Sequence, residues 1–310
     1  MRTIVTLTMN PALDVSTSIH SVAPEIKLRC ASPGFHPGGG GVNVARAVRF
    51  LGGAACAVYA AGGHTGEKLR QLLADEGIDQ LPLPIAGTTR ESFTCYEDSS
   101  GLQYRFTLPG PALSQREWRA CIDACLDRQP DYLVVSGSLP TGVPSDFYAQ
   151  LASRAHARRS RLIIDSGGDA LQAAGSAGIF LLKPNLRELE RLAGEALTDE
   201  GQIQQAAQRL IESGLTQAVI VSLGAAGAAL ATRADYVPLR APVVPIRSKV
   251  GAGDSMVGGL ALALAQGKSL LEAARFGVAA GSAAVMTPGT QLCRKDDAER
   301  LYAQMTSQAK

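Results

Sequence analysis

Short apolar runs alternate with segments of helical periodicity, and this alternation constrains the fold more than any other feature of the chain. From about residue 110 onward, runs such as DYLVVSG, RLIID and AVIVSLG are separated by amphipathic segments such as SDFYAQLASRAHA and IQQAAQRLIESG. Alternating strands and helices favour a mainly parallel sheet between two helical layers, and near-continuous apolar strands indicate burial on both faces. We therefore expect one α/β domain over residues 1–310.

Residues 89–107 break this alternation. They read TRESFTCYEDSSGLQYRFT, in which polar and apolar residues alternate around the turn EDSSG, as is typical of a β-hairpin. Two further strand-like pieces are DVSTSI at 14–19 and KLRCAS at 27–32. We expect a small antiparallel sheet, or lid, formed by about residues 12–35 and 88–110. Because a sheet with one open face needs a cover, a homodimer through this lid is also expected.

The charge and the cysteine content exclude several classes of protein. Thirty basic and 28 acidic residues give a formal net charge of +2, which provides no strong field for nucleic acid or an anionic membrane. The six cysteines and four histidines form neither a disulfide framework nor a zinc pattern, so buried structural cysteines are expected. The N-terminal segment reads as a strand rather than a signal peptide, and no apolar run reaches a membrane-spanning length. A cytoplasmic protein is expected.

The segment SKVGAGDSMVGGLALALA, residues 248–265, carries the strongest indication of chemistry. A Gly-Ala-Gly turn that opens a helix presents unpaired backbone N–H groups to an anion such as phosphate. Asp254 lies at the same helix start, where a carboxylate can accept the proton of an attacking hydroxyl. Considered alone, the motif is also consistent with a purely structural Asp254, because the helix dipole favours an acidic residue in the first turn. The GKS at 267–269 is not a Walker A site, because Leu262 stands where that motif requires glycine.

Six motifs together resemble the PfkB/ribokinase family of carbohydrate kinases, over residue 3 to about residue 300. In chain order they are GGGGVNVARAVRFLGG, SGSLPTGVP, LIIDSGGDAL, LLKPNLRELE, VSLGAAGAAL and VGAGDSMVGG. Within the family they are most similar to the PfkB-type 6-phosphofructokinase branch. The resemblance implies a ribokinase-like three-layer αβα domain with a mainly parallel sheet and a small antiparallel lid.

The resemblance assigns catalytic and nucleotide-binding roles in the second half of the chain. It implies that Asp254 is the catalytic base, and that the backbone of Gly251, Ala252 and Gly253 forms the anion hole. Glu188 would help to hold Mg²⁺ through water. The residues implied to line the ATP site are Lys183, Asn185, Ser222, Gly224 and Gly227. Considered alone, KPNLRELE is better explained as a proline turn and a surface helix. For SLGAAGAAL the alternative is a hairpin whose glycines serve only the turn.

The same resemblance implies a sugar site in the first third of the chain. Glycine backbone can approach sugar hydroxyls closely, while a carboxylate and an amide hydrogen-bond them. A phosphorylated sugar also needs cations, although each cation considered alone is better explained as protection of an edge strand against aggregation. The residues implied around the sugar are Asp14, Gly38, Gly39, Gly40, Gly41, Asn43 and Ser138. The cations in the lid segments are Lys27, Arg29, Arg90 and Arg105.

The glycine tract separates the branches of the family. The 1-phosphofructokinase and tagatose-6-phosphate kinase branches have GKGxNVA, whereas this chain reads GGGGVNVA, and KLRC at 27–30 also resembles the 6-phosphofructokinase branch. We therefore expect fructose 6-phosphate to be phosphorylated at its 1-hydroxyl by ATP with Mg²⁺.

Relatives bind K⁺ near a loop that reads NQGTR in that branch. Here the loop reads TPGTQ at 287–291, so the sequence leaves open whether this chain binds K⁺. The other branches and a non-catalytic sugar-phosphate-binding regulator remain alternatives.

Overall fold

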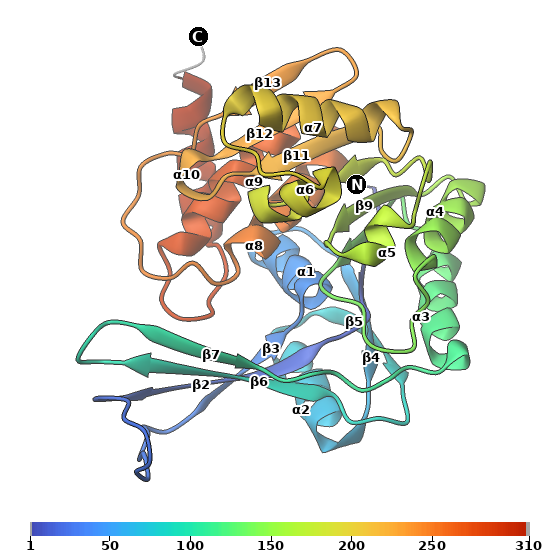
Figure 1. The fold of residues 1–310 in the computed structure, drawn as a ribbon. Helices are drawn as coiled ribbons and strands as arrows, with labels where there is room; N and C mark the ends of the chain where they lie inside the picture. Colours follow the sequence, from blue (N-terminus) through green and yellow to red (C-terminus); the bar gives the residue numbers. More distant parts are fainter. Residues whose placement is uncertain (1, 308–310) are drawn as a thin grey trace.

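Two β-sheets of different size organise the chain. The computed structural model describes residues 2–307. A nine-stranded sheet lies between two helical layers, and a four-stranded sheet lies to one side of it (Figure 1). The expected three-layer αβα architecture with an additional small sheet is therefore confirmed. No helix within the described residues is both long and apolar enough to span a membrane.

The large sheet has the strand order β13-β12-β11-β10-β9-β8-β1-β4-β5. Its parallel strands are β1 (Ile4–Thr8), β4 (Cys56–Ala61), β5 (Asp79–Pro84), β8 (Tyr132–Ser136), β9 (Arg161–Asp165), β10 (Leu181–Leu182) and β11 (Ala218–Ser222). At one edge, β12 (Ala228–Thr232) and β13 (Tyr236–Leu239) continue it antiparallel. The carboxyl ends of the parallel strands meet at one edge of the sheet, which is where α/β proteins bind their ligands.

Helices cover both faces of this sheet. One layer contains α1 (Gly40–Phe50), α2 (Gly63–Asp75), α8 (Ala252–Ala265), α9 (Leu270–Val285) and α10 (Lys295–Ser307). The other contains α3 (Gln115–Asp127), α4 (Phe147–Ala157), α5 (Asp169–Gln172), α6 (Leu186–Ala193) and α7 (Glu200–Glu212). Successive strand side chains point to opposite faces, so Ile4 packs into the first layer and Val5 into the second. Helix α8 packs between α1 and α9, and its residues 255–265 are all buried.

Local sequence explains where the helices begin. The Ser114 and Glu117 side chains form the expected capping box at the start of α3. Ser269 and Glu272 form the same motif at the start of α9. Five of the six cysteines are buried and Cys30 is exposed, so the interpretation of mostly structural thiols is confirmed.

The small sheet has the order β3-β2-β6-β7. Its strands are β2 (Ala12–Ile19), β3 (Gly34–Gly38), β6 (Arg90–Glu97) and β7 (Gln103–Thr107). The hairpin of β6 and β7 is antiparallel as expected, and so is the pair of β2 and β3. The central pair of β2 and β6 is parallel, which differs from the all-antiparallel expectation. The difference arises because these two strands belong to segments separated by α1, β4, α2 and β5.

The strand expected at residues 27–32 is wrong. That segment makes one backbone hydrogen bond to β2, from Ala31 N–H to the Ser18 carbonyl at 2.8 Å. Pro33 follows and has no N–H to donate, so regular pairing with β2 begins only at Gly34. The edge strand therefore runs directly into the glycine tract that opens α1.

The two faces of the small sheet differ in polarity. The strand register places Asp14 of β2, Ser92 of β6 and Thr107 of β7 on one face. Val15 and the neighbouring, mutually tilted rings of Phe93 and Phe106 lie on the opposite face. Phe106 is 55% exposed, so this apolar face remains partly uncovered in the single chain.

Candidate active site

A cleft of about 560 Å³ lies between the polar face of the small sheet and the carboxyl ends of the parallel strands. Its walls come from β2, β6 and β7, from the start of α1, from the ends of β8 and β9, and from the start of α8. The residues expected at the sugar and catalytic sites that line it are Asp14, Gly39, Gly40, Asn43, Arg90, Arg105, Ser138, Glu188, Gly251 and Asp254. The fold thus brings together most of the residues that were chosen from distant motifs.

A second, more apolar cleft of about 520 Å³ adjoins the first at the start of α8. The predicted residues that line it are Asn185, Ser222, Gly224, Gly227, Ala252 and Gly253. Lys249 lines both clefts. A ligand that extends through both clefts would therefore pass the Gly-Ala-Gly turn.

Backbone geometry at the start of α8 explains the glycines of this turn. Gly251 is the N-cap residue with a φ of 74°, a left-handed conformation that favours glycine. A Cβ atom at Gly251 would also lie 2.5 Å from Leu292 Cδ2. At Gly253, in contrast, no atom lies within 4 Å of a Cβ position, so the backbone there faces open space. Such open backbone at a helix N-terminus fits an anionic group.

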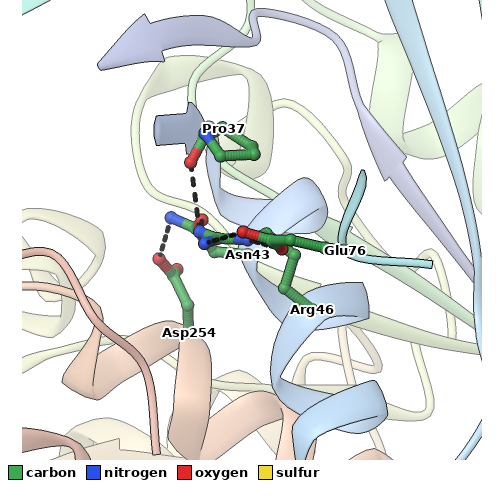
Figure 2. A network of polar contacts seen from close by, with 5 residues as sticks. All are labelled: Pro37, Asn43, Arg46, Glu76 and Asp254. Atoms are coloured by element: carbon green, nitrogen blue, oxygen red, sulfur yellow. Dashed lines mark hydrogen bonds and ion pairs between the residues drawn. The ribbon is translucent and has the colours of Figure 1, made fainter. Parts of the chain in front are cut away.

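Asp254 projects from the first turn of α8 toward Asn43 of α1. The Asn43 Nδ2 group donates a hydrogen bond of 2.9 Å to Asp254 Oδ2 (Figure 2). Burial and the neighbouring Asp165 carboxylate raise the pKa of Asp254 to about 6, while the Asn43 hydrogen bond and the Lys183 ammonium oppose this rise. A carboxyl group with such a pKa is charged at neutral pH and is a better proton acceptor than an ordinary aspartate.

Lys183 lies beneath the site and lines neither cleft. It is only 5% exposed, and its Nζ atom forms an ion pair of 2.8 Å with Asp165 Oδ1 at the end of β9. Burial alone would lower the pKa of Lys183, but the pairing with Asp165 leaves it raised. Sequence reasoning did not single out Asp165. The sequence signal that could have identified it is its position as the acidic last residue of the strand RLIID, at the carboxyl edge of the sheet.

Asp14, Arg90 and Arg105 are the charged residues of the small sheet that line the cleft. Burial raises the pKa of Asp14 to about 6, and Arg90 and Arg105 oppose this rise. The Arg90 guanidinium donates to the carbonyls of Leu108 and Asn10, at 3.2 Å each. Its Nε atom is buried without a hydrogen-bond partner in the described part of the chain. An unpaired buried donor of this kind is a favourable site for an anion.

Lys27 and Arg29 lie apart from this arrangement. Both are exposed in the segment before β3, and neither lines a cleft of its own chain. The expected grouping of four cations around one sugar phosphate is therefore reduced to Arg90 and Arg105 within the single chain.

The four glycines before Asn43 are required by packing, and only Gly39 and Gly40 of them line the first cleft. A Cβ atom at Gly40 would lie 2.2 Å from Ser136 Oγ, and one at Gly41 would lie 2.6 Å from the Leu7 carbonyl oxygen. At Gly38 it would lie 2.5 Å from the Asp14 carboxylate. Gly39 has a φ of 108°, which disfavours other residues. The tract therefore allows α1 to start in direct contact with β1 and β8.

Asn185 and Glu188 are joined by reciprocal hydrogen bonds. The Asn185 N–H donates to Glu188 Oε2 at 2.9 Å, and the Glu188 N–H donates to Asn185 Oδ1 at 3.0 Å. This capping box agrees with the simpler explanation of the motif, yet Glu188 also lines the first cleft. Within residues 2–307, no group of three or more His, Cys, Asp and Glu side chains is placed to hold a metal. A divalent cation here would take most of its ligands from water and phosphate, as Mg²⁺ commonly does.

Most of the chain matches one protein-family model. Residues 3–297 match the model of the pfkB family carbohydrate kinase. The chain is 46% identical to the ATP-dependent 6-phosphofructokinase isozyme 2 of Escherichia coli, over 98% of this chain and 99% of that protein. It is also 46% identical to the isozyme 2 of Mycobacterium tuberculosis, over 96% of this chain and 88% of that protein.

Solved structures of phosphofructokinase-2 from Escherichia coli have the same fold. One in complex with potassium superposes with a TM-score of 0.95 at 45% identity, and one in complex with fructose-6-phosphate with a TM-score of 0.93 at 44% identity. A tetrameric inhibited form has a TM-score of 0.93 at 45% identity. Each comparison covers 99% of this chain and 100% of the other.

The carboxyl groups of Asp14 and Asp254 are expected to titrate with midpoints at about pH 6, above the usual 3.8. The measurement is a pH titration of the aspartate carboxyl carbons by NMR, in which Asp14→Asn and Asp254→Asn each remove one of the two signals. Asp131 is the control, because the backbone N–H of Thr3 lowers the pKa of this carboxyl. Midpoints near 4 for both groups would contradict the described electrostatics.

Proposed function

The chain belongs to the pfkB family of carbohydrate kinases, and from this membership we propose that it is an ATP-dependent 6-phosphofructokinase. It transfers the γ-phosphoryl group of ATP to the 1-hydroxyl of fructose 6-phosphate and releases fructose 1,6-bisphosphate and ADP. The strongest support is the 46% identity to 6-phosphofructokinase isozyme 2 over nearly the full length of both chains. Retention of Asp254 beside the Gly-Ala-Gly turn supports a catalyst rather than a binding protein.

The first cleft has the chemistry that a sugar phosphate requires. Arg90 and Arg105 provide guanidinium groups on the side of the small sheet, and guanidinium groups bind phosphate oxygens well. Asp14 and Asn43 provide a carboxylate and an amide for sugar hydroxyls. Lys27 and Arg29 would take part only from another chain, because they lie outside the cleft of their own.

Asp254 acts as the general base in this mechanism. Its carboxylate accepts the proton of the 1-hydroxyl as that oxygen attacks the γ-phosphorus, and the bond from phosphorus to the ADP oxygen breaks. Asn43 holds the carboxylate by the hydrogen bond of 2.9 Å. The backbone N–H groups of Gly251, Ala252 and Gly253 stabilise the charge on the moving phosphoryl group. ATP occupies the second cleft along Asn185, Ser222, Gly224 and Gly227, with its phosphates at the start of α8.

Two cations belong to this proposal. Glu188 would hold Mg²⁺ through water at the edge of the first cleft, and a bound divalent cation would neutralise charge on the phosphates of ATP. K⁺ is proposed near residues 287–291, where the Thr290 hydroxyl is buried without a partner among the described residues. The potassium complex of phosphofructokinase-2 from Escherichia coli supports a monovalent cation in this fold.

The substrate is tested by coupled ADP release with fructose 6-phosphate, fructose 1-phosphate and tagatose 6-phosphate. We expect fructose 6-phosphate to give the highest kcat/KM and Asp254→Asn to lower kcat by about 10²–10⁴-fold, because the general base is removed. KCl is expected to support faster turnover than NaCl. Preference for another sugar would assign the chain to a different branch, and no turnover with any of them would support a regulator.

Arg90 is expected to determine affinity for the sugar phosphate. Arg90→Ala removes a half-buried guanidinium from the cleft, and a hydrogen bond to a charged group contributes about 1.5–3 kcal/mol. The KM for fructose 6-phosphate should therefore rise by about 10- to 150-fold, while the KM for ATP stays nearly constant. Arg116→Ala, an exposed position on α3, is the matched control. An equal rise of both KM values would mean that Arg90 is structural.

The apolar face of the small sheet is proposed to pair with a second copy of the chain. Phe35 and Phe106 are exposed by 41% and 55% on that face, which a partner would cover. Light scattering is expected to give about twice the chain mass of 32.3 kDa, and Phe106→Asp to reduce it toward one chain. Gln204→Asp, an exposed change on α7, serves as the control. A monomer at assay concentration would contradict this interface.

A further inference from the structure

Arg46 of α1 is a buried cation that lies behind the catalytic cleft and does not line it. The residue is only 4% exposed, although arginine is rarely buried unless it is paired. Its Nε and Nη2 atoms donate to the two carboxylate oxygens of Glu76, at 2.6 Å each. Its Nη1 atom donates to the Pro37 carbonyl at 3.2 Å and to Asn43 Oδ1 at 3.0 Å (Figure 2).

Asn43 connects this guanidinium to Asp254. Its Oδ1 atom accepts from Arg46 and its Nδ2 atom donates to Asp254, so both ends of the amide are engaged. The two ends of an amide have nearly the same shape, but one accepts and the other donates hydrogen bonds. Because arginine can only donate and a carboxylate can only accept, a single orientation of the Asn43 amide satisfies both neighbours.

We propose that Arg46 is a positioning residue for the phosphoryl transfer, because it fixes the Asn43 amide with its NH₂ group toward Asp254 while Glu76 holds Arg46 in place. This inference rests on the proposed role of Asp254 as the general base. Arg46 itself does not touch the substrate. It acts through Asn43, and its contact with Pro37 of β3 also ties this orientation to the small sheet.

The charges around Asp254 and Arg46 determine how loss of Arg46 would change the pKa of Asp254. Burial, Asp165 and Asp14 raise the pKa of Asp254, whereas the Asn43 hydrogen bond and Lys183 lower it. A reversed amide would present Oδ1 to the carboxylate and replace an attraction by a repulsion. The Asp254 carboxyl would then bind its proton more tightly, and less of it would be charged at neutral pH. Asp14, His36 and Glu76 are titratable groups near Arg46 itself. Arg294 and Lys295 line a surface cleft together with Arg46.

A purely structural role is the competing explanation, since the pair of Arg46 and Glu76 also joins α1 to α2. Removal of one partner would leave a buried charge without compensation, so both should be replaced together. The variant Arg46→Met with Glu76→Leu does this. The exposed pair of Glu67 and Arg70 on α2, replaced by Leu and Met, is the matched control.

The decisive experiment is a double-mutant cycle between this buried pair and Asn43, with fructose 6-phosphate and ATP as substrates. Replacement of the pair should lower kcat at pH 7 by about tenfold or more in the chain with Asn43, and move the acid limb of the pH profile upward. In the Asn43→Ala background the same replacement should change kcat by less than about twofold. The KM for ATP should be unaffected in both backgrounds. Equal losses of kcat in both backgrounds would overturn the inference.

Two further measurements separate the possible failures. If the double replacement does not fold, Arg46→Lys tests the same coupling, since it keeps a cation for Glu76 but removes the planar guanidinium whose Nη1 group donates to Asn43 Oδ1. If the unmodified protein transfers no phosphoryl group to fructose 6-phosphate, the proposed function fails. The inference is then tested by NMR titration of the Asp254 carboxyl. Its midpoint should rise on loss of Arg46 only when Asn43 is present, and a midpoint that does not move would overturn the positioning role.

Discussion

The site depends on the contacts that stabilise one buried carboxylate, Asp254, at the start of a buried helix. Asp254 is kept charged by the amide of Asn43, by the N-terminal end of α8 and by the Lys183 ammonium. Lys183 can be buried there only because Asp165 pairs with it at 2.8 Å. The packing of α8 between α1 and α9 places these groups at the carboxyl edge of the sheet.

The division of each sheet into two faces explains how the cleft acquires its polarity. Residues of β2, β6 and β7 alternate, so that one face of the small sheet presents charged and hydroxyl groups to the cleft while the other presents aromatic rings. The large sheet has no polar face and contributes only the ends of its strands. The cleft thus takes Asp14, Arg90 and Arg105 from the small sheet, and Gly251 and Asp254 from the large domain.

Sequence patterns predict features that repeat locally, and they miss those that depend on distant pairing. The layers and the hairpin of β6 and β7 follow from periodicity and turn residues, and the motif resemblance grouped most residues of the cleft. The strand at 27–32 failed because Pro33 delays pairing to Gly34. The contact of Arg46 with Glu76 crosses 30 positions of sequence and carries no local signal. Gly40 was interpreted as open backbone for a ligand, but Ser136 also leaves no room for a side chain there.

The parallel pairing of β2 with β6 has a consequence for how the small sheet forms. A hairpin can close on its own, whereas parallel strands require the chain to cross over between them. Here the crossover contains α1, β4, α2 and β5, which belong to the large domain. The central ladder of the small sheet is thus a long-range contact, and its loop-closure entropy must be offset by contacts that bring its two halves together. The two segments of the lid are therefore joined through elements of the large domain and do not form one continuous stretch of chain.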